Sequence, residues 1–210
     1  MRIGIIGTGQ VGSTLARKFV AAGHQVALAN SRGPQTLHGL AEELGNHAHP
    51  ASVPEAARYG EVAVVAIPFG RYPQLPAPDL AGRVLVDCTN YYPDRDGHFA
   101  DLDDGRTTST ELVAAHVPGA RVVKAFNTMA AEHLNDYGHC GGAEMLYGIP
   151  VSGDDDQAKR TVMDLVEELG FDPVDAGGLA GGGRAQQPGS QVYLADLPSD
   201  ELRARLGTPF

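Results

Sequence analysis

The segment Met1-Arg-Ile-Gly-Ile-Ile-Gly-Thr-Gly-Gln-Val-Gly12 decides the fold of this chain. It spaces Gly7, Gly9 and Gly12 as G-x-G-x-x-G, directly after an apolar stretch with the length of a buried strand. The residues that follow show the apolar spacing of an amphipathic helix. In this context Gly7 allows a tight turn, Gly9 lets the backbone approach a pyrophosphate, and Gly12 lets the helix lie close to the sheet. The segment therefore predicts a strand–turn–helix unit that binds a dinucleotide.

Further apolar runs alternate with helical patterns along the chain. Continuous apolar runs are typical of parallel strands that are covered by helices on both faces. The alternation predicts an α/β fold, a Rossmann doubly wound parallel sheet with a small C-terminal α/β extension. We expect an NADP-binding domain over residues 1–140 and a smaller region, 141–210, packed on it. The strands are expected at residues 2–6, 25–29, 61–67, 83–88 and 121–126, with shorter ones near 46–60, 145–151 and 171–174.

Local signals predict several further elements. Thr108-x-x-Glu111 has the form of a capping box, and Asp154-x-x-Gln157 is expected to cap a later helix. Residues 91–106 are polar and rich in aspartate and glycine, which favours a surface loop. Residues 177–183 contain five glycines, and we expect them to form a mobile loop.

The composition and the charge of the chain disfavour several classes of function. The formal net charge of −10 disfavours nucleic acid or an anionic membrane as the main partner. No apolar run approaches the roughly 20 residues that span a bilayer, and no secretory signal is visible, so a cytoplasmic protein is expected. Cys88 and Cys140 have no metal-ligand spacing, so the sequence predicts reduced thiols and no metal site.

The second strand is followed by Asn30-Ser31-Arg32, where an NAD-specific fold usually carries an acidic residue for the ribose 2′-hydroxyl. A carboxylate there would repel a 2′-phosphate, whereas Ser31 can donate a hydrogen bond and Arg32 a charge-assisted one. The segment therefore favours NADP(H). The alternative is an ordinary polar turn with an exposed arginine.

With these motifs placed, the chain resembles the oxidoreductases that couple NADP to coenzyme F-420 (F420), an 8-hydroxy-5-deazaflavin. It is also similar to the NADPH-binding domain of the STEAP metalloreductases. The resemblance covers residues 1 to about 176, and the Lys-Ala-Phe-Asn-Thr run is its most specific part. The matching segments are Ile6-Gly-Thr-Gly-Gln-Val-Gly12, Asn30-Ser31-Arg32, Ala66-Ile67-Pro68-Phe69, Val86-Asp87-Cys88-Thr89-Asn90, Val123-Lys124-Ala125-Phe126-Asn127-Thr128 and Ser152-Gly-Asp-Asp-Asp-Gln-Ala-Lys159.

The resemblance implies hydride transfer between NADP(H) and a second redox cofactor, the 5-deazaflavin or a flavin, and it suggests a homodimer. Such a reaction needs two rings held face to face and no metal or side-chain nucleophile. Ile67-Pro68-Phe69 and Ala125-Phe126-Asn127 would then line the nicotinamide side, with Asn127 as its polar contact. The alternative is that Phe126 is plain core and Asn127 a turn former. The expected cofactor-binding residues are Gly7, Thr8, Gly9, Gln10, Val11, Gly12, Asn30, Ser31, Arg32, Ala66, Ile67, Pro68, Asn90, Ala125 and Asn127.

The second substrate is less clearly marked. Members that use the deazaflavin have a helix and loop after Asp-Ala-Gly, where this chain has a glycine run. Its Arg184, Gln186, Gln187 and Tyr193 could bind another acceptor or make a subunit contact. His133 is a candidate proton donor, with an exposed histidine of no role as the alternative.

Two other functions stay open. One is NADPH-dependent reduction of a small carbonyl or imine compound, which needs a proton donor such as His133 or Tyr193. The other is a non-catalytic NADP(H)-binding redox sensor.

Overall fold

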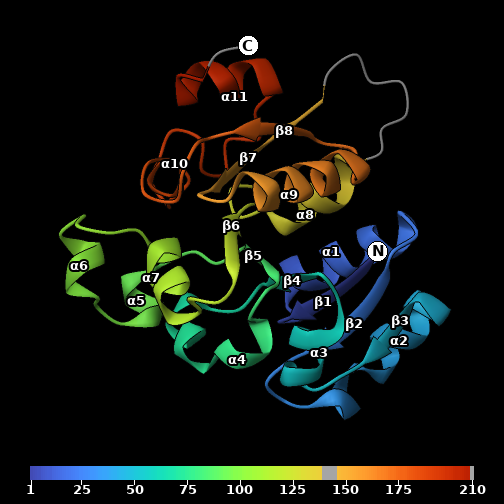
Figure 1. Ribbon diagram of the computed structural model, residues 1–210. Helices are drawn as coiled ribbons and strands as arrows, with labels where there is room; N and C mark the ends of the chain where they lie inside the picture. The colour runs from blue at the N-terminus through green and yellow to red at the C-terminus, as the bar shows by residue number, and fades with distance from the viewer. Residues whose placement is uncertain (139–145, 209–210) are drawn as a thin grey trace.

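The computed structural model describes residues 1–138 and 146–208, in which one eight-stranded sheet has the order β3-β2-β1-β4-β5-β6-β7-β8 (Figure 1). Neighbouring strands are parallel except β6 and β7, which are antiparallel. The Rossmann fold expected from the sequence is confirmed. The strands are β1 Arg2–Ile6, β2 Gln25–Ala29, β3 Ala48–Pro50, β4 Val62–Val65, β5 Val84–Asp87, β6 Arg121–Lys124, β7 Gly148–Gly153 and β8 Asp172–Asp175.

Helices connect the strands. The α-helices are α1 Gln10–Ala21, α2 His38–Leu44, α3 Val53–Tyr59, α4 Ala77–Leu80, α5 Pro93–Asp96, α6 Ala100–Asp103, α7 Ser109–His116, α8 Ala131–Asp136, α9 Asp156–Glu168, α10 Gly181–Ala185 and α11 Ser199–Leu206. The described residues also form the short 3₁₀ helices η1 Pro34–Leu37, η2 Gly45–His47 and η3 Phe69–Gln74. Among the residues described, no helix is both long enough and apolar enough to cross a bilayer.

Alternate side chains of each strand point to opposite faces of the sheet, and each face has its own core. Ile3 and Ile5 of β1 belong to a cluster with residues of α1 and α9, whereas Ile6 belongs to a cluster with residues of α3, α4 and α7. Gly4 lets α3 lie very close to the sheet, because a Cβ there would come within 1.9 Å of the Ala56 carbonyl oxygen. Helices on both faces are what the continuous apolar strands predicted.

Three local predictions need correction. The polar segment 91–106 contains the short helices α5 and α6 and is not simply a loop. Asp155, not Asp154, is the N-cap of α9, and its Oδ1 accepts from Ala158 N at 2.7 Å. Asp154 Oδ1 instead accepts from Leu179 N at 2.9 Å, which holds the glycine-rich segment against the sheet. The last three glycines of that segment lie in helix α10, so it is not simply a loop. The capping box at Thr108 and Glu111 is confirmed.

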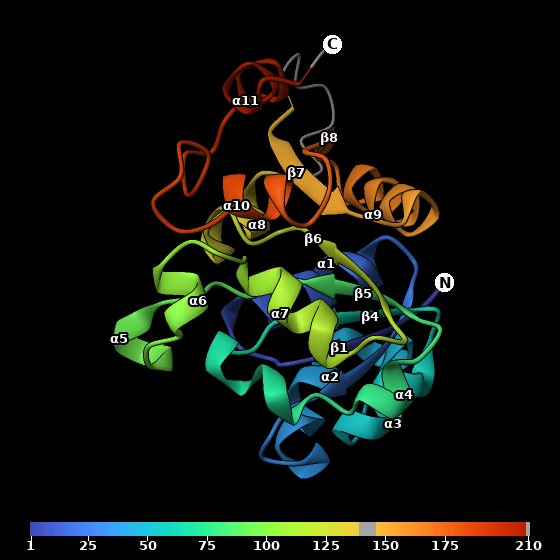
Figure 2. The same ribbon diagram turned by 60° about the vertical axis from the view of Figure 1, so that its left-hand side comes forward.

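The C-terminal elements β7, β8, α9, α10 and α11 lie in the upper part of both views, away from α3 and α4 (Figures 1 and 2), and β8 is at the opposite edge of the sheet from β3. They share a core with the N-terminal part, since one cluster contains Ile3 and Leu15 together with Val151 and Leu165. A division of the chain near residue 140 remains a prediction. Cys140 lies outside the described residues.

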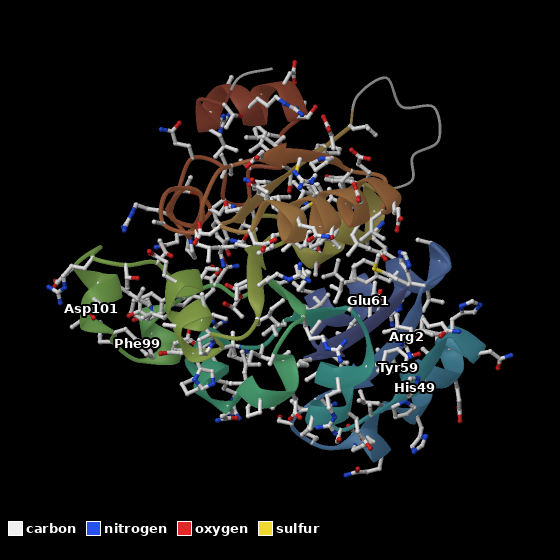
Figure 3. The ribbon with its side chains drawn as sticks, viewed as in Figure 1. Arg2, His49, Tyr59, Glu61, Phe99 and Asp101 are labelled. Atoms are coloured by element: carbon white, nitrogen blue, oxygen red, sulfur yellow. The ribbon has the colours of Figure 1, made fainter. Side chains whose placement is uncertain are left out.

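The amino ends of the first strands gather a small polar and aromatic group (Figure 3). The Arg2 guanidinium lies 5.8 Å from the centre of the Tyr59 ring. The centres of the His49 and Tyr59 rings are 4.7 Å apart. Glu61 is near them, just before β4. Phe99 and Asp101 lie at the opposite, left-hand side of the view, in the region of α6. None of these residues lines the cavities described below.

Candidate functional site

Two adjoining cavities lie at the carboxyl ends of the parallel strands, where Rossmann folds bind their ligands. The first, of about 560 Å³, lies beyond β1, β2 and β4. The second, of about 420 Å³, lies beyond β1, β4 and β5 and reaches the loop after β6. They share Gly9 and the segment Ala66-Ile67-Pro68, so one elongated molecule could occupy both.

The glycine turn forms the boundary between the two cavities. Gly7 has φ +103°, and a Cβ on Gly12 would come within 1.8 Å of the Gly7 carbonyl oxygen, so the turn requires glycine at both positions. A Cβ on Gly9 would meet no atom within 4 Å, so the space beside this backbone is open. Gly9 is the N-cap of α1 and provides no side-chain acceptor. The first N–H groups of α1 and its positive dipole end are therefore available to an anion.

Asn30 lines the first cavity, and both polar atoms of its side chain form hydrogen bonds. Its Oδ1 accepts from Arg32 N at 2.9 Å, and its Nδ2 donates to Thr36 Oγ1 at 3.0 Å and to Thr8 Oγ1 at 3.3 Å. The exposed side chains of Ser31 and Arg32 form no hydrogen bond or ion pair with any described residue. Arg71, from η3, lines the same cavity, and its side chain likewise forms no hydrogen bond or ion pair with a described residue. Two uncompensated positive charges thus border this cavity.

Asn90 and Asn127 join the ends of β5 and β6 across the second cavity. Asn127 Nδ2 donates to Asn90 Oδ1 at 3.0 Å and to the Gln186 carbonyl oxygen at 2.8 Å, while Asn90 Nδ2 donates to the Asn127 carbonyl oxygen at 2.9 Å. These two acceptors fix the orientation of the Asn127 amide. Its Oδ1 is buried and has no partner among the described residues, so it is a spare acceptor. Phe126, with φ 61°, turns the chain so that Asn127 reaches this position.

A buried ion pair lies beneath these asparagines. Lys124 Nζ is 3.2 Å from Asp87 Oδ2, and both side chains are at most 1% exposed. Lys124 Nζ also donates to the Thr89 carbonyl oxygen at 2.7 Å, and Asp87 Oδ1 accepts from Thr89 N at 2.9 Å. Asp87 Oδ2 also accepts from Thr110 Oγ1 at 2.6 Å. The pair therefore fixes both backbone polar groups of the residue that precedes Asn90.

The glycine-rich segment 177–183 leads to Gln186, which contacts the Asn127 side chain in the lining of the second cavity. A Cβ on Gly182 would come within 2.3 Å of both the Ala176 carbonyl oxygen and Ser152 Oγ, so α10 approaches β7 at a distance that only glycine allows. The buried Gln186 at its end hydrogen-bonds Ser152 through Nε2 and offers its carbonyl to Asn127. These contacts give Gln186 a structural position, and its Oε1 is buried without a partner among the described residues.

Two tyrosines and one arginine also line the second cavity. The hydroxyl groups of Tyr92 and Tyr193 contact each other, and the Arg95 guanidinium lies 4.8 Å from the centre of the Tyr92 ring. Burial, followed by the hydrogen bond to Tyr92, raises the pKa of Tyr193 well above its usual range. Tyr193 therefore stays a neutral phenol near pH 7. The apolar residues Leu194, Met129 and Ala130 also line this cavity.

The structure places most of the expected site residues around the two cavities. Those that line the cavities are Gly7, Thr8, Gly9, Gln10, Val11, Asn30, Ser31, Arg32, Ala66, Ile67, Pro68, Asn90 and Asn127. Gly12 shapes the turn, while Ala125 and Phe126 are fully buried in the core. His133 lines neither of these two cavities; it pairs through Nδ1 with Asp196 and stacks on Tyr137. Cys88 lines the second cavity, and burial raises the pKa of its thiol, which favours the unreactive form.

Sequence reasoning missed several residues of the lining. Arg71 lies in η3, at the start of the proline-rich connection between β4 and β5, and Tyr92 and Arg95 lie in the segment expected to be a loop. No spacing rule connects these residues to the glycine turn, because they reach the cavities only through tertiary folding. Across residues 1–138 and 146–208, no group of three or more His, Cys, Asp or Glu side chains could hold a metal ion.

Comparison with known proteins gives consistent matches. A family model described as NADP oxidoreductase coenzyme F420-dependent matches residues 2–91. A crystal structure from Arthrobacter sp. FB24, described as an F420-dependent NADP reductase, is 31% identical with a TM-score of 0.72 and covers 85% of this chain and 86% of that one. A hypothetical protein of Sinorhizobium meliloti is 34% identical, with a TM-score of 0.83, and covers 94% of this chain and 95% of that one.

Metalloreductase STEAP3 of Rattus norvegicus is 34% identical over 181 residues, which are 85% of this chain and 34% of that protein. The chain thus spans about a third of the length of the curated relatives it matches. The Arthrobacter structure is similar over most of both chains, and the family model covers the segment that carries the glycine turn. This chain belongs to the coenzyme F420-dependent NADP oxidoreductase family.

Proposed function

We propose that this protein transfers hydride between NADP(H) and a planar redox cofactor, a flavin or a 5-deazaflavin. The observation that carries the proposal is the continuity of the two cavities across Gly9 and Ala66-Ile67-Pro68. A dinucleotide that crosses this boundary has its pyrophosphate beside the open backbone of Gly9 and the N-terminus of α1. Its adenosine half then occupies the first cavity, and its nicotinamide half the second.

The charges of the first cavity support NADP(H) in preference to NAD(H). Arg32 and Arg71 supply two uncompensated guanidinium groups, and no Asp or Glu lines this cavity among the described residues. Arginine binds phosphate through several parallel hydrogen bonds, and an acidic residue would have repelled a 2′-phosphate. Ser31 offers a further donor.

The polar groups of the second cavity support the position of the nicotinamide. Asn127 Oδ1 is a buried acceptor without a partner, which suits the amide N–H of a carboxamide. Bound NADPH would supply a hydride, and a solvent proton taken up after the transfer would complete the two-electron reduction of the acceptor. The chain's own residues orient the rings and exclude water. A homodimer remains a proposal on the family resemblance.

Reduction of a small carbonyl or imine is a second candidate, supported by the Tyr92–Tyr193 hydroxyl pair in the cavity. Tyr193 can donate a hydrogen bond to a carbonyl oxygen, but its raised pKa makes it a weak acid. His133 pairs with Asp196 outside both of these cavities, so it offers less support for this candidate. Transfer between two stacked rings needs no such acid, and we therefore favour it.

Replacement of Arg32 tests the donor half of the proposal. Arg32→Ala should weaken NADP(H) binding by about 1.5–3 kcal/mol, the scale of a hydrogen bond to a charged group, and should leave NAD(H) binding little changed. Isothermal titration with each cofactor measures this difference. The exposed Arg160 of α9 lines neither cavity, so Arg160→Ala is a matched control. An equal loss of binding free energy for both cofactors would show that Arg32 does not bind the 2′-phosphate.

Stopped-flow oxidation of NADPH tests the reaction itself. We expect oxidation with a flavin or deazaflavin, and none with simple aldehydes, ketones or imines. Tight NADPH binding without oxidation by any acceptor would instead favour a redox sensor.

A further inference from the structure

Arg95 presents a firmly held cation to the second cavity, which it lines with its side chain 45% exposed. Asp96 binds the guanidinium through two parallel bonds, from Nε to Oδ1 at 2.9 Å and from Nη2 to Oδ2 at 2.8 Å. Nη2 also donates to the Asn90 carbonyl oxygen at 2.6 Å. The guanidinium carbon lies 4.8 Å from the centre of the Tyr92 ring. These contacts together hold the guanidinium in one orientation.

One edge of this guanidinium is left for a ligand. The contacts above use the N–H group on Nε and both N–H groups on Nη2. Those on Nη1 form no hydrogen bond with any described residue. Because the guanidinium is planar, Nη1 lies on the side away from the Asp96 carboxylate. A ligand in the second cavity can therefore accept from a donor whose orientation is already fixed.

The carboxylate that holds Arg95 does not itself line the cavity. The Asp96 side chain is 1% exposed. Burial raises its pKa, but hydrogen bonds from Arg95 and from the backbone N–H groups of Tyr92 and Gly70 bring the pKa below its usual range. Among the described residues, no Asp or Glu lines the second cavity, so its lining presents Arg95 as a cation with the negative charge behind it.

Arg95 also lies close to the polar group that suits the nicotinamide. Its Nη2 bonds to the carbonyl oxygen of Asn90, and the Asn90 side chain pairs with Asn127. Asn127 Oδ1 is the buried acceptor without a partner among the described residues. A planar ring stacked on a nicotinamide at Asn127 would therefore share the second cavity with Arg95.

Hydride transfer between stacked rings creates a charge that a cation can stabilise. The C4–H bond of NADPH breaks with its electron pair, and a bond to hydrogen forms at position 5 of the flavin or deazaflavin ring. NADPH is oxidised, the ring is reduced, and the displaced negative charge collects at N1 and the C2 carbonyl oxygen until solvent supplies a proton. A fixed donor at that edge lowers the energy of the transition state, in which this charge develops.

We propose that Arg95 is a catalytic residue that donates through Nη1 to the N1–C2 carbonyl edge of the acceptor ring and stabilises the negative charge formed there. The inference rests on the proposed function, since it requires a flavin or deazaflavin stacked on the nicotinamide. Both kinds of ring have this edge, so the contact serves either acceptor. Asp96 is a positioning residue, because it acts through Arg95. The contact strengthens as charge develops, so Arg95 contributes more to the rate of transfer than to binding of the oxidised ring.

A double variant tests this role with riboflavin, which has the ring but no phosphate that Arg95 could bind instead. Arg95→Met combined with Asp96→Asn removes both charges and leaves no buried carboxylate without its cation. In anaerobic stopped-flow with saturating NADPH and riboflavin, the rate constant of hydride transfer should fall about tenfold or more. The Kd of oxidised riboflavin, measured by fluorescence quenching with NADP⁺ bound, should rise less than about threefold.

The pair of Arg106 and Asp101 provides the matched control. It is also an arginine–aspartate pair, both of its side chains are more than half exposed, and neither residue lines the second cavity. Arg106→Met combined with Asp101→Asn should leave both the rate constant and the Kd of riboflavin unchanged.

A second measurement needs no variant. The absorbance of reduced riboflavin, bound together with NADPH so that neither molecule can oxidise the other, follows the ionisation of its N1–H group. A cation beside N1 favours the anionic form, so the pKa of this group should be lower on the protein than in free reduced riboflavin. In the double variant this pKa should return toward the value of the free molecule. A merely structural role for Arg95 would not move it.

The outcomes separate this inference from the proposed function. An unchanged rate constant in the double variant would overturn the inference, and so would weaker riboflavin binding with an unchanged rate at saturation. A loss of NADP⁺ affinity as large as the loss of rate would overturn it too, because Arg95 would then serve the nucleotide. If far-UV circular dichroism shows that the double variant is unfolded, the titration of the unmodified protein decides, and equal pKa values for bound and free reduced riboflavin refute the inference. If the unmodified protein oxidises NADPH with neither riboflavin nor 5-deazariboflavin, the proposed function itself fails.

Discussion

At the scale of single residues, the buried pair of Asp87 and Lys124 is the feature least expected in the core of a sheet. Two charges removed from water cost several kcal/mol each unless they are well compensated. Here Asp87 receives bonds from Thr89, Thr110 and Lys124, while Lys124 also reaches the Thr89 carbonyl. The pair fixes the backbone that presents Asn90, so its energetic cost is linked to the geometry of the site.

Removal of one partner should therefore be worse than removal of both. Lys124→Met leaves the Asp87 carboxylate buried without its cation and should lower the free energy of unfolding by about 3–5 kcal/mol. The double variant Asp87→Asn with Lys124→Met removes both charges and keeps an acceptor for Thr89 N, so it should recover part of that loss. Urea unfolding is measured for the unmodified protein, for the single variants Lys124→Met and Asp87→Asn, and for the double variant. If the double variant is as unstable as the sum of the single changes, charge compensation is not what the pair provides.

The residues that could be anticipated from the sequence were those whose role depends on local backbone. Gly7 and Gly12 are required by contacts inside one turn, and Arg32 follows the second strand at a fixed distance from it. Arg71 and Tyr92 could not be found in this way. Each enters its cavity from a separate crossing segment, so its place depends on how distant parts of the chain pack.

At the scale of elements, the glycine-rich segment shows how composition alone misleads. A run of glycines predicts mobility because glycine loses much conformational entropy on folding. In α10, however, Gly182 contacts β7 so closely that no side chain fits, and Asp154 fixes the segment through Leu179 N. Likewise, apolar patterning could indicate that β7 is a strand, but its antiparallel direction depends on the whole connection after β6.

Adjacent glycines of α10 offer a matched comparison. Gly182→Ala places a methyl group within 2.3 Å of the Ala176 carbonyl oxygen, which should lower the free energy of unfolding by about 1–3 kcal/mol through overpacking. A Cβ on Gly181 meets nothing within 4 Å, so Gly181→Ala should be neutral or stabilise by about 0.5–1 kcal/mol. Thermal unfolding of the two variants separates these effects. Similar behaviour of both would mean that α10 does not pack this tightly in solution.

At the scale of the whole molecule, one core extends through both parts of the chain. Ile3 and Phe19 share a hydrophobic cluster with Val151, Val162 and Phe171. The cavities lie at the ends of strands in the same sheet, and Gln186 connects the C-terminal part to Asn127. Because these contacts cross the expected boundary near residue 140, we infer that both parts unfold together.

The protein should accordingly unfold in one transition that shifts as a whole when NADP⁺ binds. Far-UV circular dichroism and tyrosine fluorescence should give the same midpoint, since the chain has tyrosines but no tryptophan. NADP⁺ at about one hundred times its Kd should stabilise the folded state by about 2.7 kcal/mol, which raises Tm by roughly 5–10 °C for a chain of this size. NAD⁺ at the same concentration should shift it less, because it lacks the phosphate that Arg32 and Arg71 can bind. Two transitions, of which NADP⁺ moves only one, would mean that residues 141–210 form a separate folding unit despite the shared core.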